Sequence, residues 1–128
     1  MVMRILVADD DARVRSALRL VLEQVPGLTV VGERTSARAL PPRVGRIRPD
    51  ALFLDWEQPG VDDGAILPRL RASCPGLLVV ALGSIPHARR GALAAGADYF
   101  IAKSDPPDVL LACVQALTTS GAPVRSAA

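Results

Sequence analysis

The sequence predicts an α/β fold, a doubly wound parallel sheet of five strands with five helices. Short apolar runs of strand length alternate along the chain with segments whose apolar residues recur at helical spacing. The runs are apolar throughout, which is typical of strands that helices cover on both faces of a parallel sheet. A length of 128 residues suits one domain built around such a core.

The strand-like runs come first. We expect strands at residues 4–8, 29–32, 51–55, 77–82 and 99–102. Two of these strands end on carboxylates, because Asp9-Asp10-Asp11 follows the first run and Asp55 ends the third. Side chains at the carboxyl ends of parallel strands line the sites of open α/β sheets.

The first two helices follow from spacing and from prolines. Apolar residues recur every three or four positions from Val14 to Val25, and Pro26-Gly27 ends this pattern. The pattern over residues 36–48 is weaker. We expect the second helix to begin near Pro41, because a proline is harmless only in the first turn.

The remaining helices have clearer boundary signals. The third is expected to open at Asp62-Asp63-Gly64, to run to about residue 73 and to be disturbed by Pro68. The fourth covers residues 86–95. The fifth is expected to begin with Asp105 as N-cap and Pro106 in its first turn. We expect one domain over residues 1–118 and a flexible C-terminal tail over residues 119–128, which are small and polar.

Composition excludes several classes of protein. No apolar run approaches the ~20 residues of a membrane span, so we expect a cytoplasmic protein without membrane association. The net charge is +2 and the basic residues are scattered along the sequence, which does not indicate direct nucleic acid binding. Cys74 and Cys113 lack the spacing and partners of a metal site, so buried or incidental thiols are expected.

The lysine content is unusual. Of fifteen basic residues fourteen are arginine, and Lys103 is the only lysine. A single retained ammonium indicates a position that needs a compact point charge, with chance as the alternative.

Four residues are expected to share one crevice. A strand order of 2-1-3-4-5 makes the first and third strands neighbours, so that Asp9, Asp10 and Asp55 meet, and Lys103 leans in from the fifth strand. Converging carboxylates repel one another unless a cation offsets them, and Mg²⁺ prefers such oxygen ligands. A further carboxylate in such a site can act as a nucleophile that forms an aspartyl phosphate, with Lys103 neutralising a phosphoryl oxygen. The first turn lacks the glycines of a nucleotide-binding motif.

These residues, taken in order, resemble the receiver domain of bacterial two-component response regulators. The resemblance covers about residues 3–118 and includes the acid pair after Ala8, Asp55 with Pro59 four positions on, Ala95-Gly96-Ala97-Asp98, and Lys103. It implies a flavodoxin-like (CheY-like) fold. It also implies that Asp55 accepts a phosphoryl group, in a Mg²⁺-dependent reaction, from a sensor histidine kinase or a histidine phosphotransfer protein, and that phosphorylation switches partner binding.

The resemblance also assigns roles. Asp9, Asp10 and Asp55 would hold Mg²⁺ together with the backbone carbonyl of Glu57, Lys103 would contact the phosphoryl group, and Phe100 occupies the aromatic switch position. Such a domain is not a conventional enzyme, and catalyses at most its own phosphorylation and dephosphorylation. The last two helices and the fifth strand form the surface that such domains use for homodimers or partners, with an ordinary solvated face as the alternative.

The sequence departs from the family at three places. Gly83 stands where the family has a Thr or Ser, so Ser84 is the neighbouring candidate for the switch hydroxyl. Asp63 stands where a glycine is usual, and Ser104 replaces the proline that often follows the lysine.

Two other functions stay open. A degenerate pseudo-receiver would act as a phosphorylation-independent protein interaction module, which Gly83, Asp63 and the interrupted second helix favour. A small Mg²⁺ phosphohydrolase is the other, because Asp9-x-Asp11 matches the nucleophile pattern of haloacid-dehalogenase-like enzymes. The sequence identifies neither the kinase, the downstream target nor the pathway.

Overall fold

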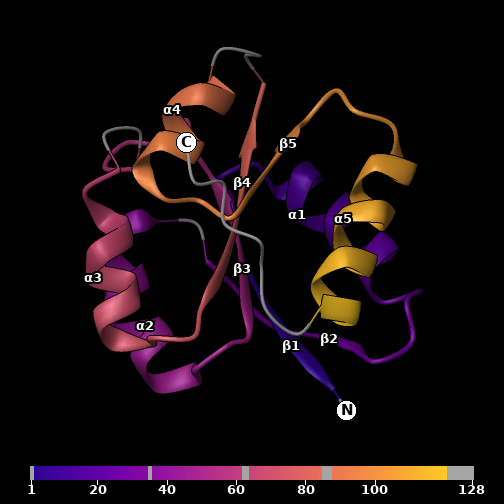
Figure 1. Cartoon of the computed structure of the whole chain (residues 1–128), viewed down its shortest axis with the longest axis horizontal. Helices are drawn as coiled ribbons and strands as arrows, with labels where there is room; N and C mark the ends of the chain where they lie inside the picture. The colour runs from indigo at the N-terminus through magenta and orange to yellow at the C-terminus, as the bar shows by residue number, and fades with distance from the viewer. Residues whose placement is uncertain (1, 35, 62–63, 85–87, 121–128) are drawn as a thin grey trace.

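The computed structural model of the chain describes residues 2–34, 36–61, 64–84 and 88–120 (Figure 1). Five strands form one parallel sheet in the order β2-β1-β3-β4-β5, which confirms the predicted topology. The strands are β1 (Met3–Ala8), β2 (Leu28–Arg34), β3 (Ala51–Asp55), β4 (Leu78–Gly83) and β5 (Tyr99–Ala102).

Helices cover both faces of the sheet. They are α1 (Ala12–Leu22), α2 (Leu40–Ile47), α3 (Ile66–Ser73), α4 (Ala88–Ala95) and α5 (Pro107–Ser120), with a 3-10 turn, η1 (Ala37–Ala39), directly before α2. Figure 1 shows α1 and α5 on one side of the sheet and α2, α3 and α4 on the other. Two separate hydrophobic clusters fill the two interfaces between helices and sheet.

The central strand β3 is buried by helices on both faces of the sheet. All five residues of β3 are buried, and their side chains alternate between the two clusters: Leu52 and Leu54 face α2 and α3, whereas Phe53 faces α1 and α5. β1 pairs with β3 so that Ala8 lies opposite Leu54. The residues that follow, Asp9 and Asp55, therefore reach the same edge of the sheet.

The second helix begins where the prolines allow it. Ser36 caps η1 through a hydrogen bond from the Arg38 N–H to its Oγ (3.3 Å). Pro41 and Pro42 lie in the first turn of α2, where a missing N–H has no intrahelical acceptor to lose. The prediction that this helix begins near Pro41 is confirmed.

The third helix begins later than its acidic start signal indicates. Gly64 has a φ of +77°, a left-handed conformation outside the helix, and α3 starts at Ile66. Pro68 then falls in the first turn and does not disturb the helix, contrary to the prediction. Asp62 and Asp63 lie outside the described residues.

The fifth helix also differs from its prediction. Asp105 is not its N-cap, because the helix starts at Pro107 and the Asp105 carboxylate instead accepts a hydrogen bond from the Ala102 N–H (3.0 Å). α5 runs to Ser120, beyond the expected domain boundary at residue 118. Residues 121–128 of the expected tail lie outside the described part of the chain.

Both cysteines are free thiols, Cys74 directly after α3 and Cys113 within α5. Cys74 is buried and Cys113 is half-buried, and burial raises the pKa of Cys113 to about 11. That thiol therefore stays protonated near neutral pH. None of the helices in the described ranges has the length and apolar character needed to cross a membrane.

Asp98 joins three elements at the edge of the sheet. Its Oδ2 accepts hydrogen bonds from Arg71 Nη2 of α3 (2.7 Å) and from the Val79 N–H of β4 (2.8 Å). Arg71 also donates to the Gly96 carbonyl (2.8 Å), and the Asp98 side chain is fully buried. Removal of one partner would leave a largely buried charge without its counter-ion.

We expect Asp98→Asn to lower the free energy of unfolding by about 3 kcal/mol, because Arg71 would lose its buried counter-ion. Urea denaturation followed by circular dichroism measures this change. Glu23→Gln is the control, since it breaks only the exposed Arg19–Glu23 pair and should cost less than about 1 kcal/mol. An Asp98→Asn effect no larger than that of Glu23→Gln would contradict the assigned role.

Candidate functional site

Three carboxylates meet at the carboxyl edge of the sheet. Asp9 and Asp10 follow β1, Asp55 ends β3, and one carboxylate oxygen from each lies within 4.8 Å of the others. Asp9 and Asp55 are buried, whereas Asp10 is exposed. The predicted convergence of these acids is therefore present in the fold.

Lys103 reaches this cluster from the end of β5. Its Nζ lies 2.8 Å from Asp9 Oδ2 and 3.3 Å from Asp55 Oδ1. Its backbone N–H donates to the Gly83 carbonyl (2.8 Å), which continues the pairing of β5 with β4 and fixes the start of the side chain. Burial alone would lower the pKa of Lys103, but the two carboxylates outweigh it and raise that pKa. The side chain is thus an ammonium ion at neutral pH.

The environment of Asp55 is unfavourable for a negative charge. Burial is the main cause that raises the pKa of Asp55, and the neighbouring Asp9 raises it further. The Glu57 N–H (3.0 Å from Asp55 Oδ1) and the Lys103 ammonium act in the opposite direction without cancelling the rise. The pocket therefore holds more negative charge than its one ammonium balances.

The donor set fits a hard divalent cation. Asp9 Oδ1 accepts from the Asp11 N–H (2.9 Å). Asp9 Oδ2 is buried and close to the Lys103 ammonium, yet it has no hydrogen bond of acceptable geometry among the described residues. Such an oxygen, beside two further carboxylates, is suited to a cation such as Mg²⁺, and no described His or Cys joins the cluster. The Glu57 carbonyl as a further ligand stays a prediction.

Asp11 has a different role from its neighbours. Its carboxylate caps α1 by accepting from the Arg13 N–H (2.9 Å), and these contacts lower the pKa of Asp11. It is therefore occupied at the helix start, and the Asp9-x-Asp11 pair of a phosphohydrolase is not supported.

Two residues that support the site escaped the sequence analysis. Gln58 is buried, and its Nε2 donates to the carbonyls of Ala8 (3.3 Å) and Asp55 (3.4 Å), which joins the ends of β1 and β3. Arg15 Nη1 donates to the Asp9 carbonyl (2.7 Å) from α1. A polar residue just beyond an apolar strand was the only available signal for Gln58.

Among the predicted switch residues Gly83, Ser84 and Phe100, only Ser84 has a hydroxyl, and this hydroxyl is already hydrogen-bonded. A Cβ at Gly83 would lie 3.0 Å from two ring carbons of Phe100, so the glycine leaves space for that half-buried ring. The Ser84 hydroxyl donates to Glu57 Oε1 (2.7 Å) and also lies 2.9 Å from Oε2, while the Ser84 N–H donates to Oε1 (2.8 Å). We call this pair the Glu57–Ser84 clasp. It connects the loop after β3 with the loop after β4.

Trp56, the residue after Asp55, packs in the core and does not lie at the rim of the acidic pocket. It is 3% exposed and belongs to the hydrophobic cluster beneath α2, α3 and α4. The backbone N–H of Trp56 donates to the Leu82 carbonyl (2.8 Å), which continues the pairing of β3 with β4 beyond Asp55.

Comparisons with known proteins agree with this geometry. The family model described as the response regulator receiver domain matches residues 5–115. A protein-glutamate methylesterase/protein-glutamine glutaminase of Symbiobacterium thermophilum is 34% identical over 98% of this chain and 38% of its own length. One from Shewanella oneidensis is 36% identical over 80% of this chain and 30% of its own length. The chain thus spans about a third of these two relatives.

Solved structures share the fold. A LuxR-family two-component response regulator from Aurantimonas sp. SI85-9A1 superposes with a TM-score of 0.83 at 24% identity, over 96% of this chain and 89% of that one. The response regulator domain of Thermotoga maritima CheB gives a TM-score of 0.77 at 24% identity, over 92% of this chain and 98% of that one. Since the family model matches most of the chain, this protein belongs to the response regulator receiver domain family.

Proposed function

We propose that this receiver domain accepts a phosphoryl group on Asp55 in a Mg²⁺-dependent reaction and thereby switches its binding to a downstream protein. The observation that carries the proposal is the position of Asp55, which ends β3 beside the Lys103 ammonium (3.3 Å) and the carboxylates of Asp9 and Asp10. A buried carboxylate beside one lysine and two more acids is suited to phosphoryl transfer, which depends on positioning and charge neutralisation.

The two oxygens of Asp55 have different surroundings. Oδ1 accepts from the Glu57 N–H and lies near Lys103, whereas no described group donates to Oδ2. We assign Oδ2 as the nucleophile. It forms the new O–P bond as the bond from phosphorus to the donor's imidazole nitrogen breaks, and the electron pair leaves with the imidazole. Lys103 neutralises charge on the transferred group, and bound Mg²⁺ would supply further charge neutralisation at Asp9, Asp10 and Asp55.

The donor and the partners follow from the family. A sensor histidine kinase or a histidine phosphotransfer protein is the proposed phosphodonor, in the cytoplasm. The proposed homodimer or partner surface consists of α4, β5 and α5, where Arg89 and Arg90 are exposed and Tyr99 is half-buried. The methylesterase and glutaminase activities belong to the relatives that carry those names, of which this chain matches only a part.

The Glu57–Ser84 clasp is the proposed resting state of the switch. A phosphoryl group on Asp55 would place negative charge near the carboxylate of Glu57, because Glu57 lies only two residues after Asp55. Like charges repel, so the carboxylate would release Ser84. The freed hydroxyl would then donate to the phosphoryl group and take over the role of the hydroxyl that Gly83 lacks.

A pseudo-receiver is the second candidate, and one observation favours it. The Ser84 hydroxyl is held by Glu57 and Gly83 has no side chain, so the resting structure directs no hydroxyl from these two positions at Asp55. A domain of this kind would bind its partner equally well as wild type and as Asp55→Asn, with or without a phosphoryl mimic.

We expect radiolabelled acetyl phosphate with Mg²⁺ to label the wild-type chain, because Asp55 Oδ2 is available for attack. Asp55→Asn should reduce the label to background, and removal of Mg²⁺ with a chelator should do the same. Asp108→Asn, an exposed acid in the first turn of α5, is the matched control and should label normally. Label that persists in Asp55→Asn would place the acceptor elsewhere.

We expect Mg²⁺ to change the fluorescence of Trp56, which is the only tryptophan and directly follows Asp55. Asp9→Asn should weaken the apparent affinity for Mg²⁺ by more than ~10-fold, because loss of a residue that only hydrogen-bonds to a metal ligand already lowers metal affinity by that much. The titration of Asp108→Asn should match the wild type. If Asp9→Asn also titrated like the wild type, Asp9 would not be a ligand.

We expect Ser84→Ala to accept phosphate but to lose the conformational response, because no hydroxyl would be released. Beryllofluoride should change amide hydrogen exchange in α4 of the wild type and leave it nearly unchanged in Ser84→Ala. Ser16→Ala, on the exposed face of α1, should respond like the wild type. A full response in Ser84→Ala would show that the clasp is not the switch.

A further inference from the structure

Arginines that are spread along the sequence gather on one side of the fold. Nine of the fourteen arginines fall in residues 34–49 and 64–97, two segments that contain no Asp or Glu. These segments include α2 and α3, which pack side by side over the same face of the sheet (Figure 1). A chain with a net charge of only +2 therefore brings several positive charges to the side of the sheet that α2 and α3 cover.

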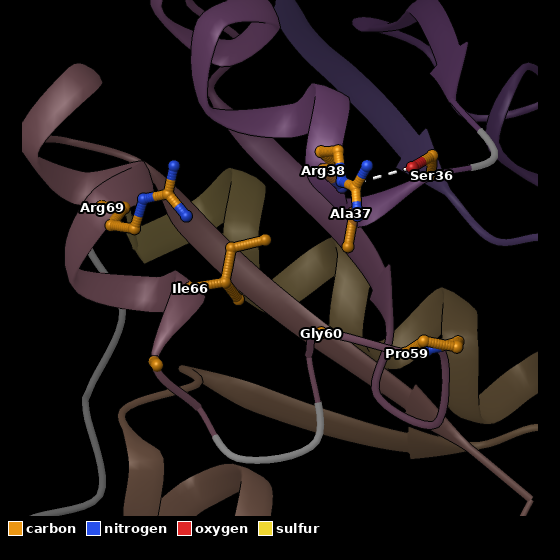
Figure 2. Close-up of a pocket in the computed structure, with 8 residues that line it drawn as sticks. Ser36, Ala37, Arg38, Pro59, Gly60, Ile66 and Arg69 are labelled. Carbon is orange, nitrogen blue, oxygen red and sulfur yellow. Dashed lines mark hydrogen bonds between the residues drawn. The ribbon is translucent and has the colours of Figure 1, made fainter.

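A pocket of about 490 Å³ opens in this surface between η1 and the start of α3. Figure 2 shows Arg38 and Arg69 on two sides of the pocket, with Ile66 between them. Ala37 and Pro59 add apolar lining. The pocket thus combines two cations at its rim with an apolar interior, and its volume lies within the range of ligand sites, about 300–1,000 Å³.

The guanidinium groups at this pocket have no counter-ion among the residues that the structure describes. Within the described ranges, no carboxylate lies within salt-bridge distance of Arg38 or Arg69, and both side chains are exposed. Arg71, also in α3, is by contrast paired with Asp98. Asp62 and Asp63, which lie between the pocket residues Gly60 and Ala65 in sequence, are outside the described residues.

The outer side of α2 continues this surface. Arg43 and Arg46 line a second hollow of about 320 Å³. The Arg43 Nε is buried and has no hydrogen-bond partner in the part of the chain that the structure describes. A buried N–H donor without an acceptor is costly, so this side chain would gain by moving outward to an acceptor at the surface.

The chemistry of the surface favours carboxylates on aliphatic stems. Guanidinium groups bind carboxylates through two parallel hydrogen bonds, and the apolar lining suits the methylene groups that carry them. Surfaces for single-stranded nucleic acid combine positive charge with aromatic side chains on which bases stack. No aromatic residue lines either hollow.

We propose that this surface, defined by Arg38, Arg43, Arg46 and Arg69, docks an acidic segment of a partner protein. A Glu or Asp side chain of that segment enters the pocket between Arg38 and Arg69, and an adjacent aliphatic residue packs against the exposed Pro59. The proposal does not depend on phosphorylation of Asp55, so the two ideas can fail separately.

Fluorescence anisotropy with a short labelled peptide of alternating Glu and Leu tests the proposal on the full chain at low ionic strength. We expect the wild type and Asp55→Asn to bind equally, and the double variant Arg38→Ala/Arg69→Ala to bind about tenfold more weakly, because two charge-assisted pairs are lost. Arg13→Ala removes a single exposed positive charge from α1, away from this surface, and should bind nearly as well as the wild type. A Gln-Leu peptide should not bind.

Three results would overturn the proposal. One is the absence of binding at low ionic strength. Another is a loss of binding free energy in the double variant that is no more than twice the loss in Arg13→Ala, which would reflect net charge alone. The third is tighter binding of a single-stranded oligonucleotide of the same charge with the same dependence on Arg38 and Arg69, which would make this a nucleic acid surface. Circular dichroism of each variant verifies that the fold is kept.

Discussion

Two carboxylates held side by side by backbone pairing are the constraint on which the rest of the structure depends. β1 and β3 pair in parallel with Ala8 opposite Leu54. The next residues, Asp9 and Asp55, are therefore brought together although their negative charges repel. Helices on both faces exclude water, which raises the pKa of Asp55 and leaves Lys103 as the nearest counter-charge. The apolar strands thus create a local excess of negative charge. A bound cation would relieve that excess.

Gly83, at the end of β4, affects the arrangement of the residues around it. Gly83 gives the Phe100 ring space that a side chain would fill, since a Cβ there would lie 3.0 Å from the ring. Ser84, the next residue, has a hydroxyl that Glu57 already holds through the clasp. Gly83, Ser84 and Phe100 are thus coupled to one another and to Glu57 by direct contacts. Their arrangement links the two loops that border Asp55.

The sequence predicted the features that depend on local pattern. The five strands, their order and the acid cluster around Asp55 were all accessible, because apolar runs and terminal acids are local signals. The starts of α3 and α5 were not, since each depends on how a proline or glycine fits its turn: Gly64 is left-handed and Pro68 fills the first turn of α3. The roles of Gln58 and Trp56 depend on contacts between distant segments. Charges scattered in sequence gave no sign that α2 and α3 would bring arginines together.

Lys103, described above as a counter-ion, also allows the site to be modified selectively by reagents that react with amines. It is the only lysine, so the chain has one side-chain primary amine, and that amine lies between Asp9 and Asp55. Reagents and enzymes that modify amines, by acetylation or by cross-linking, can act only there and at the chain's amino terminus. Acetylation of Lys103 would remove the positive charge that faces both acids. Modification of this one nitrogen would in this way change the charge of the pocket while leaving the Asp55 carboxylate unmodified.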